Sequence, residues 1–428
     1  MKRVVAPASS GPGRWLLTVG GLGVCQIVSW GGSYYLPAVL AQPIARDTGW
    51  SLDWIVGGLS MGLLVSGLIA RRVGGAIDRL GGRPVLAAGS VLLAGGLVVV
   101  GLSQELAVYL FGWVVIGLGM GATLYDAAFS TLGRLYGTAA RRAITHLTLV
   151  AGFASTASWP LSAVLVENVG WRGTCLAYAA LQLLVALPLH LLVIPREPRS
   201  LAPAETEAPP TSAASVPSRR PALFALLAAI LASSGLIMSL WSVHLVTILR
   251  EGGLGLSAAV SLAALIGPAQ VAARVVELAF GARHHPILTL ALAAALIALG
   301  FVLLWLGLGV PAVALICYGA GNGVWSIARG TLPLELYGAS GYPIVMGKLA
   351  TPNLVIQALA PSIGAVLLGA VGASGTLGAL AALALANVVA VGLLWAMIRH
   401  GPPRSLASAA GAADPAGRAS PPPGKEHR

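Results

Sequence analysis

Four charged side chains, Asp126, Arg274, Arg329 and Arg72, interrupt long apolar stretches of the sequence. A charge held away from water is costly unless it is paired or faces a wet cavity, so these residues are candidates for chemistry. A carboxylate in such a setting can bind and release a proton near neutral pH, and a guanidinium can hold a carboxylate through two parallel hydrogen bonds. We therefore expect Asp126 to carry a proton or bind a cation, and Arg329 or Arg274 to bind an anion.

Each of these charges also has a structural alternative. A neighbour in the sequence compensates the charge, or the side chain extends to the aqueous edge of the membrane. These alternatives are Thr123 and Ser130 as partners of Asp126, Glu335 as partner of Arg329, Glu277 as partner of Arg274, and an aqueous position for Arg72 beside Arg71.

Polar and aromatic residues at helical spacing are further candidates. Asn322 and Trp325 lie seven and four residues before Arg329, so the three share one face of a helix. Such a stripe is typical of a binding wall, and interhelical hydrogen bonding or aromatic packing is the alternative. The remaining candidates, in two other apolar stretches, are Gln26, Trp30, Tyr34 and His244.

The composition indicates that these residues lie in a membrane. Of 428 residues, 57% are hydrophobic and 9% are charged, against about 25% charged in a soluble domain. The net charge of +12 is spread over short clusters between apolar stretches, so nucleic-acid binding is not expected. The three cysteines are far apart in the sequence, and we expect no disulfide framework, no metal site and no cofactor. A conventional soluble enzyme is excluded.

Twelve apolar stretches are long enough to cross ~30 Å of hydrocarbon as helices. Because they are continuously apolar rather than alternating over ~10 residues, they favour helices over a β-barrel. We expect an all-α polytopic membrane protein whose twelve helices form two pseudo-symmetric six-helix bundles. The helices are expected near 14–40, 52–73, 84–103, 106–130, 143–166, 172–194, 222–248, 256–279, 286–307, 311–333, 346–370 and 373–398.

Polar stretches divide the chain into four expected parts. These are an N-terminal bundle over 1–194, a cytoplasmic linker over 195–221, a C-terminal bundle over 222–400 and a disordered cytoplasmic tail over 401–428. Lys and Arg concentrate in the loops on one side, which predicts that this side and both termini are cytoplasmic.

The two halves carry a weak internal repeat. Arg72-Val73 matches Arg274-Val275 at an offset of 202, and the Leu-Tyr-Gly sequence at 135–137 matches that at 336–338 at an offset of 201. A six-helix unit repeated in parallel is typical of transporters.

An ion pair between Asp126 and Arg329 across the repeat axis is a further hypothesis. The offset of 201 places Asp126 opposite Ile327 and Arg329 opposite Ala128, about 200° away on a helical wheel. Either the alignment slips by a residue or the two groups face different directions.

The loop between the second and third expected helices reads Gly74-Gly-Ala-Ile-Asp78-Arg79-Leu-Gly81-Gly82-Arg83-Pro84. It resembles the G-x-x-x-D-R-x-G-R-R signature of the major facilitator superfamily, with Gly82 in place of the first arginine of the pair. Together with the helices and the central linker, the resemblance covers essentially the whole chain. It implies a gate that latches the two bundles together on the cytoplasmic side in one state, formed by Gly74, Asp78, Arg79, Gly81 and Arg83.

Two further motifs are similar to the bacterial monocarboxylate-porter-like branch of that superfamily. Gly49-Trp50-Ser51 follows a Tyr-Tyr-Leu-Pro sequence at 34–37, and Gln270-x-x-x-Arg274 resembles the Asp-x-x-x-Arg pair of the branch, with Gln in place of Asp. The drug-antiporter signature is absent from residues 152–160, which read GFASTASWP.

The resemblance implies a secondary active transporter that works by alternating access. Proton-coupled transport of a small, monocarboxylate-like organic anion is the expected function, and proton-coupled efflux of a drug-like or toxic compound is the alternative. It also implies a monomeric, multi-pass protein of the bacterial inner membrane. Its expected partners are a small-molecule substrate, protons or another coupling ion, and the lipid bilayer.

Overall fold

The computed structural model describes residues 12–196, 221–308 and 311–400. The expected tail and most of the expected linker lie outside these residues. Regular structure in the described ranges is helical, and the α-helices are α1 (Pro12–Gly31), α2 (Leu36–Thr48), α3 (Leu52–Leu80), α4 (Gly82–Leu102), α5 (Leu106–Thr123), α6 (Tyr125–Tyr136), α7 (Ala140–Ala151), α8 (Ala154–Leu181), α9 (Leu187–Val193), α10 (Pro221–Glu251), α11 (Leu256–Ala263), α12 (Ile266–Phe280), α13 (Pro286–Trp305), α14 (Pro311–Tyr337) and α15 (Tyr342–Arg399).

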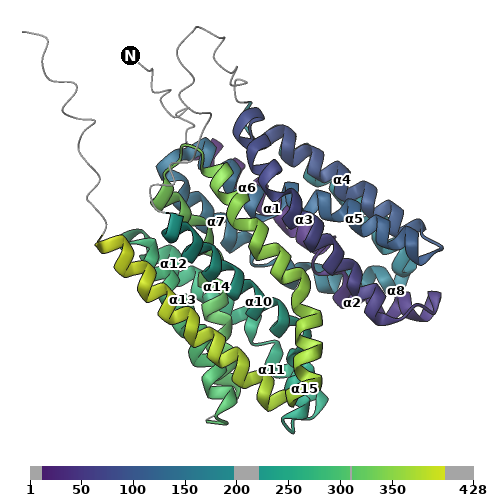
Figure 1. Ribbon diagram of the computed structural model, residues 1–428. Coiled ribbons are helices and arrows are strands. Elements are labelled where there is room, and N and C mark those ends of the chain that lie inside the picture. The colour runs from purple at the N-terminus through teal and green to yellow at the C-terminus, as the bar shows by residue number, and fades with distance from the viewer. Residues whose placement is uncertain (1–11, 197–220, 309–310, 401–428) are drawn as a thin grey trace, which may run out of the picture.

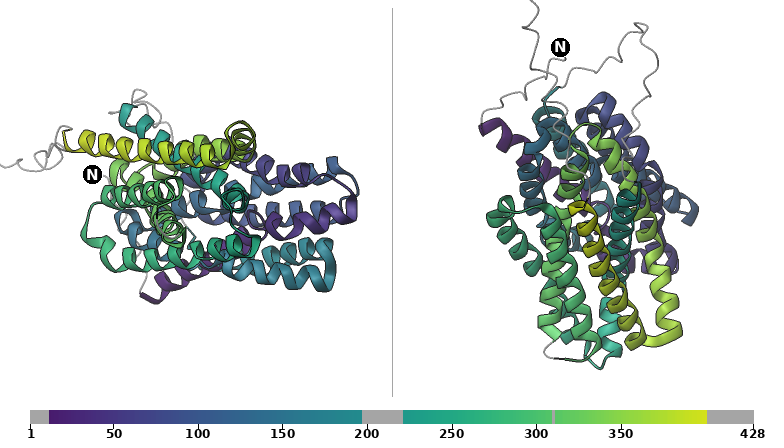
Figure 2. Two further views of the ribbon diagram at one scale, coloured as in Figure 1. Left: turned by 90° about the horizontal axis from the view of Figure 1, so that it is seen from below. Right: turned by 60° about the vertical axis from the view of Figure 1, so that its left-hand side comes forward.

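The helices form two groups that pack side by side. Helices α1–α9 pack mainly with one another and α10–α15 do the same, while the first part of α15 lies along α3 of the other group. Figure 1 shows this green part of α15 beside the purple and blue helices, and both views of Figure 2 show the two groups in contact. We call the surface between the groups the seam, and the end of the molecule where the chain leaves at residue 196 and returns at 221 the linker end.

Nine continuous helical stretches in the described residues are long and apolar enough to cross a membrane. Two of them, Leu106–Val193 with 88 residues and the 58-residue α15, are far longer than the ~20 residues that one crossing needs. Each contains a glycine with positive φ, Gly170 at 70° and Gly372 at 66°, where the chain reverses direction because glycine tolerates this conformation. The expected helices are therefore joined in the structure, and their number stays a prediction.

Several of the expected helices are broken within their length. The first breaks between Gly31 and Leu36, the fourth at Leu124, the fifth at Gly152 and Phe153, and the eighth between Ala263 and Ile266. Broken helices within a membrane are tolerated only where the freed backbone groups are buried in protein or face a cavity. The sequence predicted continuous helices at these places, and the breaks matter because the candidate site lies beside three of them.

Glycines allow the two groups to approach closely on the linker side of the seam. A Cβ atom on Gly74 would collide with the carbonyl oxygen of Pro343 on α15, and one on Gly347 of α15 would collide with the carbonyl oxygen of Ala70 on α3. On α6, a Cβ on Gly133 would collide with the ring of Tyr342. The backbones of α3 and α15 are thus in contact, α6 packs against the Tyr342 ring, and the seam is closed toward the linker end.

Candidate central site at the seam

An ion pair crosses the seam between α6 and α14. Arg329 donates a hydrogen bond from Nη2 to Oδ2 of Asp126. The side chains are 9% and 18% exposed respectively, so both charges are largely removed from water. Asp126 lies in the first turn of α6, where the positive end of the helix dipole favours a carboxylate. The pair that the sequence raised as a hypothesis is present in the structure.

Thr123 and Ser130, which the sequence suggested as partners of the Asp126 carboxylate, bind backbone carbonyl groups instead. Ser130 donates to the backbone carbonyl of Asp126 over 2.6 Å, not to its carboxylate. Thr123 donates to the carbonyl oxygen of Gly119 over 2.9 Å. The partner of the Asp126 carboxylate is therefore Arg329, which lies 203 residues away in the sequence.

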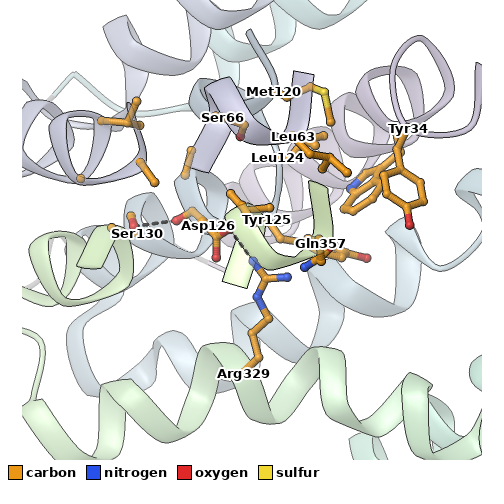
Figure 3. A pocket seen from close by; sticks show the side chains of 18 residues that line it. Tyr34, Leu63, Ser66, Met120, Leu124, Tyr125, Asp126, Ser130, Arg329 and Gln357 are labelled. Carbon is orange, nitrogen blue, oxygen red and sulfur yellow. Dashed lines mark hydrogen bonds and ion pairs between the residues drawn. The ribbon is translucent and has the colours of Figure 1, made fainter. Parts of the chain in front are cut away.

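The ion pair borders a small pocket between the two groups of helices. Figure 3 shows Arg329 reaching from α14 to Asp126, with Tyr125 and Gln357 beside the pair. The open space is about 30 Å³, room for one or two water molecules. The lining residues come from α1, α3, α5, α6, α14 and α15 and the segments that join them, and are Trp30, Tyr34, Leu63, Ser66, Ala70, Val73, Gly74, Met120, Gly121, Leu124, Tyr125, Asp126, Ala127, Ser130, Arg329, Gly347, Leu354 and Gln357. In this conformation the pocket is too small for an organic substrate.

Arg274 is the second buried arginine, and it has no carboxylate partner. The residue is 5% exposed. Its Nε atom donates to the carbonyl oxygen of Gly323 and to Oγ of Ser326, each over 3.2 Å. Nη2 is 3.5 Å from Oε1 of Gln270, and Nη1 is buried without a hydrogen-bond partner. The guanidinium is held by neutral groups only.

Glu277 is not the partner of Arg274 that the sequence suggested. Its Oε1 accepts a hydrogen bond from Thr289 over 2.8 Å, and its Oε2 lies 3.7 Å from Nε2 of His284. Because Asp126 neutralises Arg329, the charges at the centre of the molecule leave one positive charge uncompensated, on Arg274. Tyr35 and Tyr125 are close enough to Arg274 to interact with it electrostatically.

Aromatic rings cover one side of the pocket. The Trp30 ring contacts those of Tyr34, Tyr35 and Tyr125, with centroids 5.3, 5.8 and 5.2 Å away. Gln26 is fully buried, donates to the carbonyl oxygen of Thr123 over 2.6 Å and accepts from Trp30 over 3.2 Å. The structure thus brings the predicted Trp30 and Tyr34 to the pocket, and Gln26 lies behind them as a support.

The other predicted lining residues lie outside the pocket. The ring of Trp325 packs in the α10–α15 group and faces the Arg329 guanidinium, with its centroid 5.5 Å from Cζ. Asn322 is half-buried on the same helix. Nε2 of His244 lies 3.0 Å from the carbonyl oxygen of Pro361. Trp325 therefore touches one member of the ion pair, whereas His244 binds the backbone of α15.

The gating motif lies where α3 turns into α4. Gly81 has a φ of 83° and forms this turn, and the carbonyl oxygen of Asp78 accepts a hydrogen bond from Arg134. Arg79 is exposed and Arg83 is half-buried at the linker end. Gly74 is the residue of this motif that contacts α15 directly.

Four residues at the centre were missing from the sequence-based set. Tyr125 and Gln357 line the pocket, Tyr35 contacts Trp30, and Gly152 lies against Nη1 of Arg274. Tyr125 is adjacent to Asp126 in the sequence, which was a usable signal. Nothing in the sequence indicated that Gly152 meets Arg274, 122 positions later.

Membrane-length helices in two groups, with buried charges at the seam between them, are typical of membrane transporters. The model of the Major Facilitator Superfamily matches residues 22–351, and the chain belongs to this family. Its members are transporters, not enzymes.

Individual relatives agree with this assignment. The chain is 30% identical to monocarboxylate transporter 3 of Rattus norvegicus over 192 residues, which cover 42% of this chain and 36% of the relative. The matched region thus spans about a third of that protein.

Solved structures with the same fold include three transporters. The human organic anion transporter MFSD10 (TETRAN) has a TM-score of 0.69 at 17% identity and covers 89% of this chain and all of its own. FucP in the outward conformation has a TM-score of 0.67 at 15% identity, and the match covers 89% of this chain and 99% of FucP. The proton:xylose symporter XylE, bound to 6-bromo-6-deoxy-D-glucose, has a TM-score of 0.66 at 10% identity. The match covers 91% of this chain and 95% of XylE. At these identities the likeness concerns the fold.

Proposed function

We propose that this protein is a secondary active transporter that couples the movement of protons to that of a small organic anion. The stretch Leu106–Val193 divides into three at the turn beginning at Gly137 and at Gly170, and α15 divides into two at Gly372. These divisions give twelve crossings, six in each group. The two groups then rock about the central site, which is the alternating-access arrangement of transporters built from repeats. The Lys and Arg bias of the loops supports a cytoplasmic linker end and cytoplasmic termini in a bacterial inner membrane, and a monomer suffices for this mechanism.

The observation that carries the proposal is the Asp126–Arg329 ion pair across the seam. The pair holds α6 and α14 together while the linker side is closed. Adding a proton to Asp126 removes its negative charge and with it most of the attraction to Arg329. Proton binding therefore favours separation of the two groups at the linker end, which couples proton uptake to the change of access.

The charge balance supports an anion as the substrate. With Asp126 and Arg329 neutralising each other, Arg274 contributes a net positive charge that no described carboxylate balances. An anionic substrate would compensate it, and a carboxylate matches the fork of N–H donors of a guanidinium. MFSD10 is named as an organic anion transporter and the rat relative as a monocarboxylate transporter, which agrees with this substrate class.

The test is proton flux in proteoliposomes that contain the purified protein and a trapped pH dye. Acetate, lactate, pyruvate and benzoate are each added outside, and the wild type is compared with Asp126→Asn. We expect at least one carboxylate to acidify the lumen in a protein-dependent way, and Asp126→Asn to abolish this acidification while exchange of labelled for unlabelled anion persists.

Protein-free liposomes control for the permeation of protonated acids through the lipid. If no carboxylate drives proton entry but an organic cation drives outward proton movement, the anion proposal is wrong and the efflux alternative is supported. If Asp126→Asn retains full carboxylate-driven acidification, the proposed coupling role of Asp126 is wrong.

A further inference from the structure

The loop between α12 and α13 carries a cluster of titratable side chains. The chain leaves the linker end along α10 and returns along α11 and α12, so this loop lies at the linker end. Glu277, in the last turn of α12, is 7% exposed. Its Oε1 accepts a hydrogen bond from Thr289 of α13 over 2.8 Å, and its Oε2 lies 3.7 Å from Nε2 of His284 in the loop. One buried carboxylate thus connects α12, α13 and the loop between them.

Arg141 connects this cluster to the other group of helices. It lies in the first turn of α7, which packs against α12 across the seam (Figure 1). Its Nη2 donates to the carbonyl oxygen of Gly281, in the same loop as His284. Gly281 packs so closely on Glu277 that a Cβ atom there would collide with Oε1, and Arg141 interacts electrostatically with Glu277. A positive charge of the α1–α9 group is therefore attracted to a buried negative charge of the α10–α15 group.

The internal repeat relates this loop to the gating motif. At the offset of 202, His284-His285-Pro286 corresponds to Gly82-Arg83-Pro84. An arginine stays charged at every pH that a cell experiences, whereas a histidine ordinarily changes its charge between about pH 5 and 8. The loop of the second half thus carries titratable side chains at the positions where the first half carries a permanent charge.

We propose that the contact between Arg141 and this loop is a second latch on the linker side, and that protonation of His284 weakens it. While His284 is neutral, the charge of Glu277 attracts Arg141 across the seam. A protonated His284 compensates Glu277 from 3.7 Å and repels the guanidinium. Acidification on the linker side therefore favours opening of that side. This regulation rests on the alternating access proposed above and is independent of the substrate.

Other charged and titratable groups lie on the elements around the cluster, and they are Glu335 on α14, Arg283 and His285 in the loop, and Arg142 and His146 on α7. Glu335 interacts with Arg141 in both charge states of His284. Arg283 is exposed, so solvent screens its charge. Arg142 and His146 both contact the ring of Trp15 on α1, within their own group of helices. The change in charge of His284 thus keeps its direction of effect.

His285 is the second titratable side chain of the loop. Its Nδ1 accepts a hydrogen bond from the amide of Ile287 over 3.1 Å and caps α13. A proton on His285 would remove this cap and also add positive charge to the loop. The test therefore includes His285→Asn, which retains a capping oxygen.

The test is the pH dependence of access to the linker side of the seam. Ser130→Cys places a thiol at the pocket, in a protein whose three native cysteines are replaced by alanine. An impermeant thiol reagent is added from the linker side at about pH 5.5 and about pH 7.5. His400→Gln is the matched control, because His400 is exposed at the end of α15. Each rate is divided by that of the control at the same pH, which removes the pH dependence of the thiol, and Asp126 is present in every protein.

We expect His284→Gln to label about fivefold more slowly than the control at the acidic pH, and equally at the higher pH, because its side chain stays neutral. His284→Arg carries a permanent charge, so it should label about fivefold faster than the control at the higher pH and equally at the acidic pH. In a protein that carries Arg141→Gln, the further change His284→Gln should have no effect at either pH. The last comparison tests whether His284 acts through Arg141.

Three results separate the latch from the proposed function. If neither His284→Gln nor His284→Arg differs from the control at either pH, while the wild type carries protons with carboxylates, the latch is wrong and the proposed function stands. If labelling follows the expectations above but no carboxylate drives proton flux, the anion proposal is wrong and the latch stands. If His285→Asn, and not His284→Gln, slows labelling at the acidic pH, the assignment of the latch to His284 is wrong.

Discussion

The two buried arginines of the α10–α15 group, Arg329 and Arg274, face the same seam but have opposite surroundings. Arg329 meets a carboxylate from the other group of helices, whereas Arg274 meets a glycine and has an unsatisfied N–H group. A buried arginine with its partner in place stabilises one arrangement of the helices, and a buried arginine without one needs an anion from outside. In the proposed function, this difference corresponds to a division of work in which Arg329 controls access and Arg274 binds the substrate.

Replacing Arg274 should have the largest effect. Arg274→Gln removes the uncompensated charge, and we expect kcat/KM for carboxylate-driven proton flux to fall by about 1,000-fold or more. Arg72→Gln is the matched control, because Arg72 is the counterpart of Arg274 in the repeat but is exposed, and it should stay within about twofold. Equal losses in the two variants would contradict the special role of Arg274.

Breaking the ion pair should lower the stability of the protein, in addition to the loss of proton coupling expected for Asp126→Asn. Asp126→Asn or Arg329→Gln alone leaves the other group buried and unpaired, so each should lower the free energy of unfolding by about 3 kcal/mol. The double variant should lose less than the sum of the two, as measured by denaturation in mixed micelles. Additive losses would mean that the two side chains do not interact in the protein.

Overpacking the linker side tests whether this side closes as described. Gly74→Ala places a methyl group against Pro343 and should destabilise the closed seam by about 2 kcal/mol. The measurement is labelling of a cysteine at position 130, in a protein without other cysteines, by an impermeant thiol reagent added from the linker side. Labelling should be faster in Gly74→Ala than in Gly75→Ala, whose Cβ has open space; equal rates would argue against a seam closed at Gly74.

Giving Arg274 a carboxylate should make it resemble Arg329. Gln270 already lies 3.5 Å from Nη2, so an aspartate there is within reach of the guanidinium and competes with the substrate. Gln270→Asp should raise the KM for pyruvate about tenfold near neutral pH, with recovery at acidic pH as the new carboxylate is protonated. Gln270→Asn, which adds no charge, is the control, and an equal rise in both variants would exclude competition by charge.

Much of the fold followed from the sequence. The apolar stretches, the positions of the polar segments and the motif from Gly74 to Pro84 were sufficient to predict a helical membrane protein of this family, which the matching family model confirms. The helix starts at Pro286 and Pro311 agree with those predicted. These features depend on local composition and on proline at the start of a helix, which are read directly from the chain.

The candidate site could be predicted only in part. The sequence singled out Asp126, Arg274 and Arg329 because a charge in an apolar stretch is conspicuous. The repeat offset of 201 left open whether Asp126 and Arg329 face each other, because it places them about 200° apart on a helical wheel. The structure breaks the fourth expected helix at Leu124, whose ψ of −172° is extended. The pairing of Asp126 with Arg329, 203 residues apart, is a contact between two groups of helices that no local pattern specifies.

The sequence by itself determined that the protein is a helical membrane protein, to which family it belongs, and that Asp126, Arg274 and Arg329 are charges within apolar stretches, because these properties depend on the types of residues and their local spacing. Only the tertiary structure decided which arginine is paired, that Gly152 meets Arg274, and that the linker side of the seam is closed. These features depend on breaks in helices and on contacts between residues more than 100 positions apart, and small changes in helix direction decide which side chains meet.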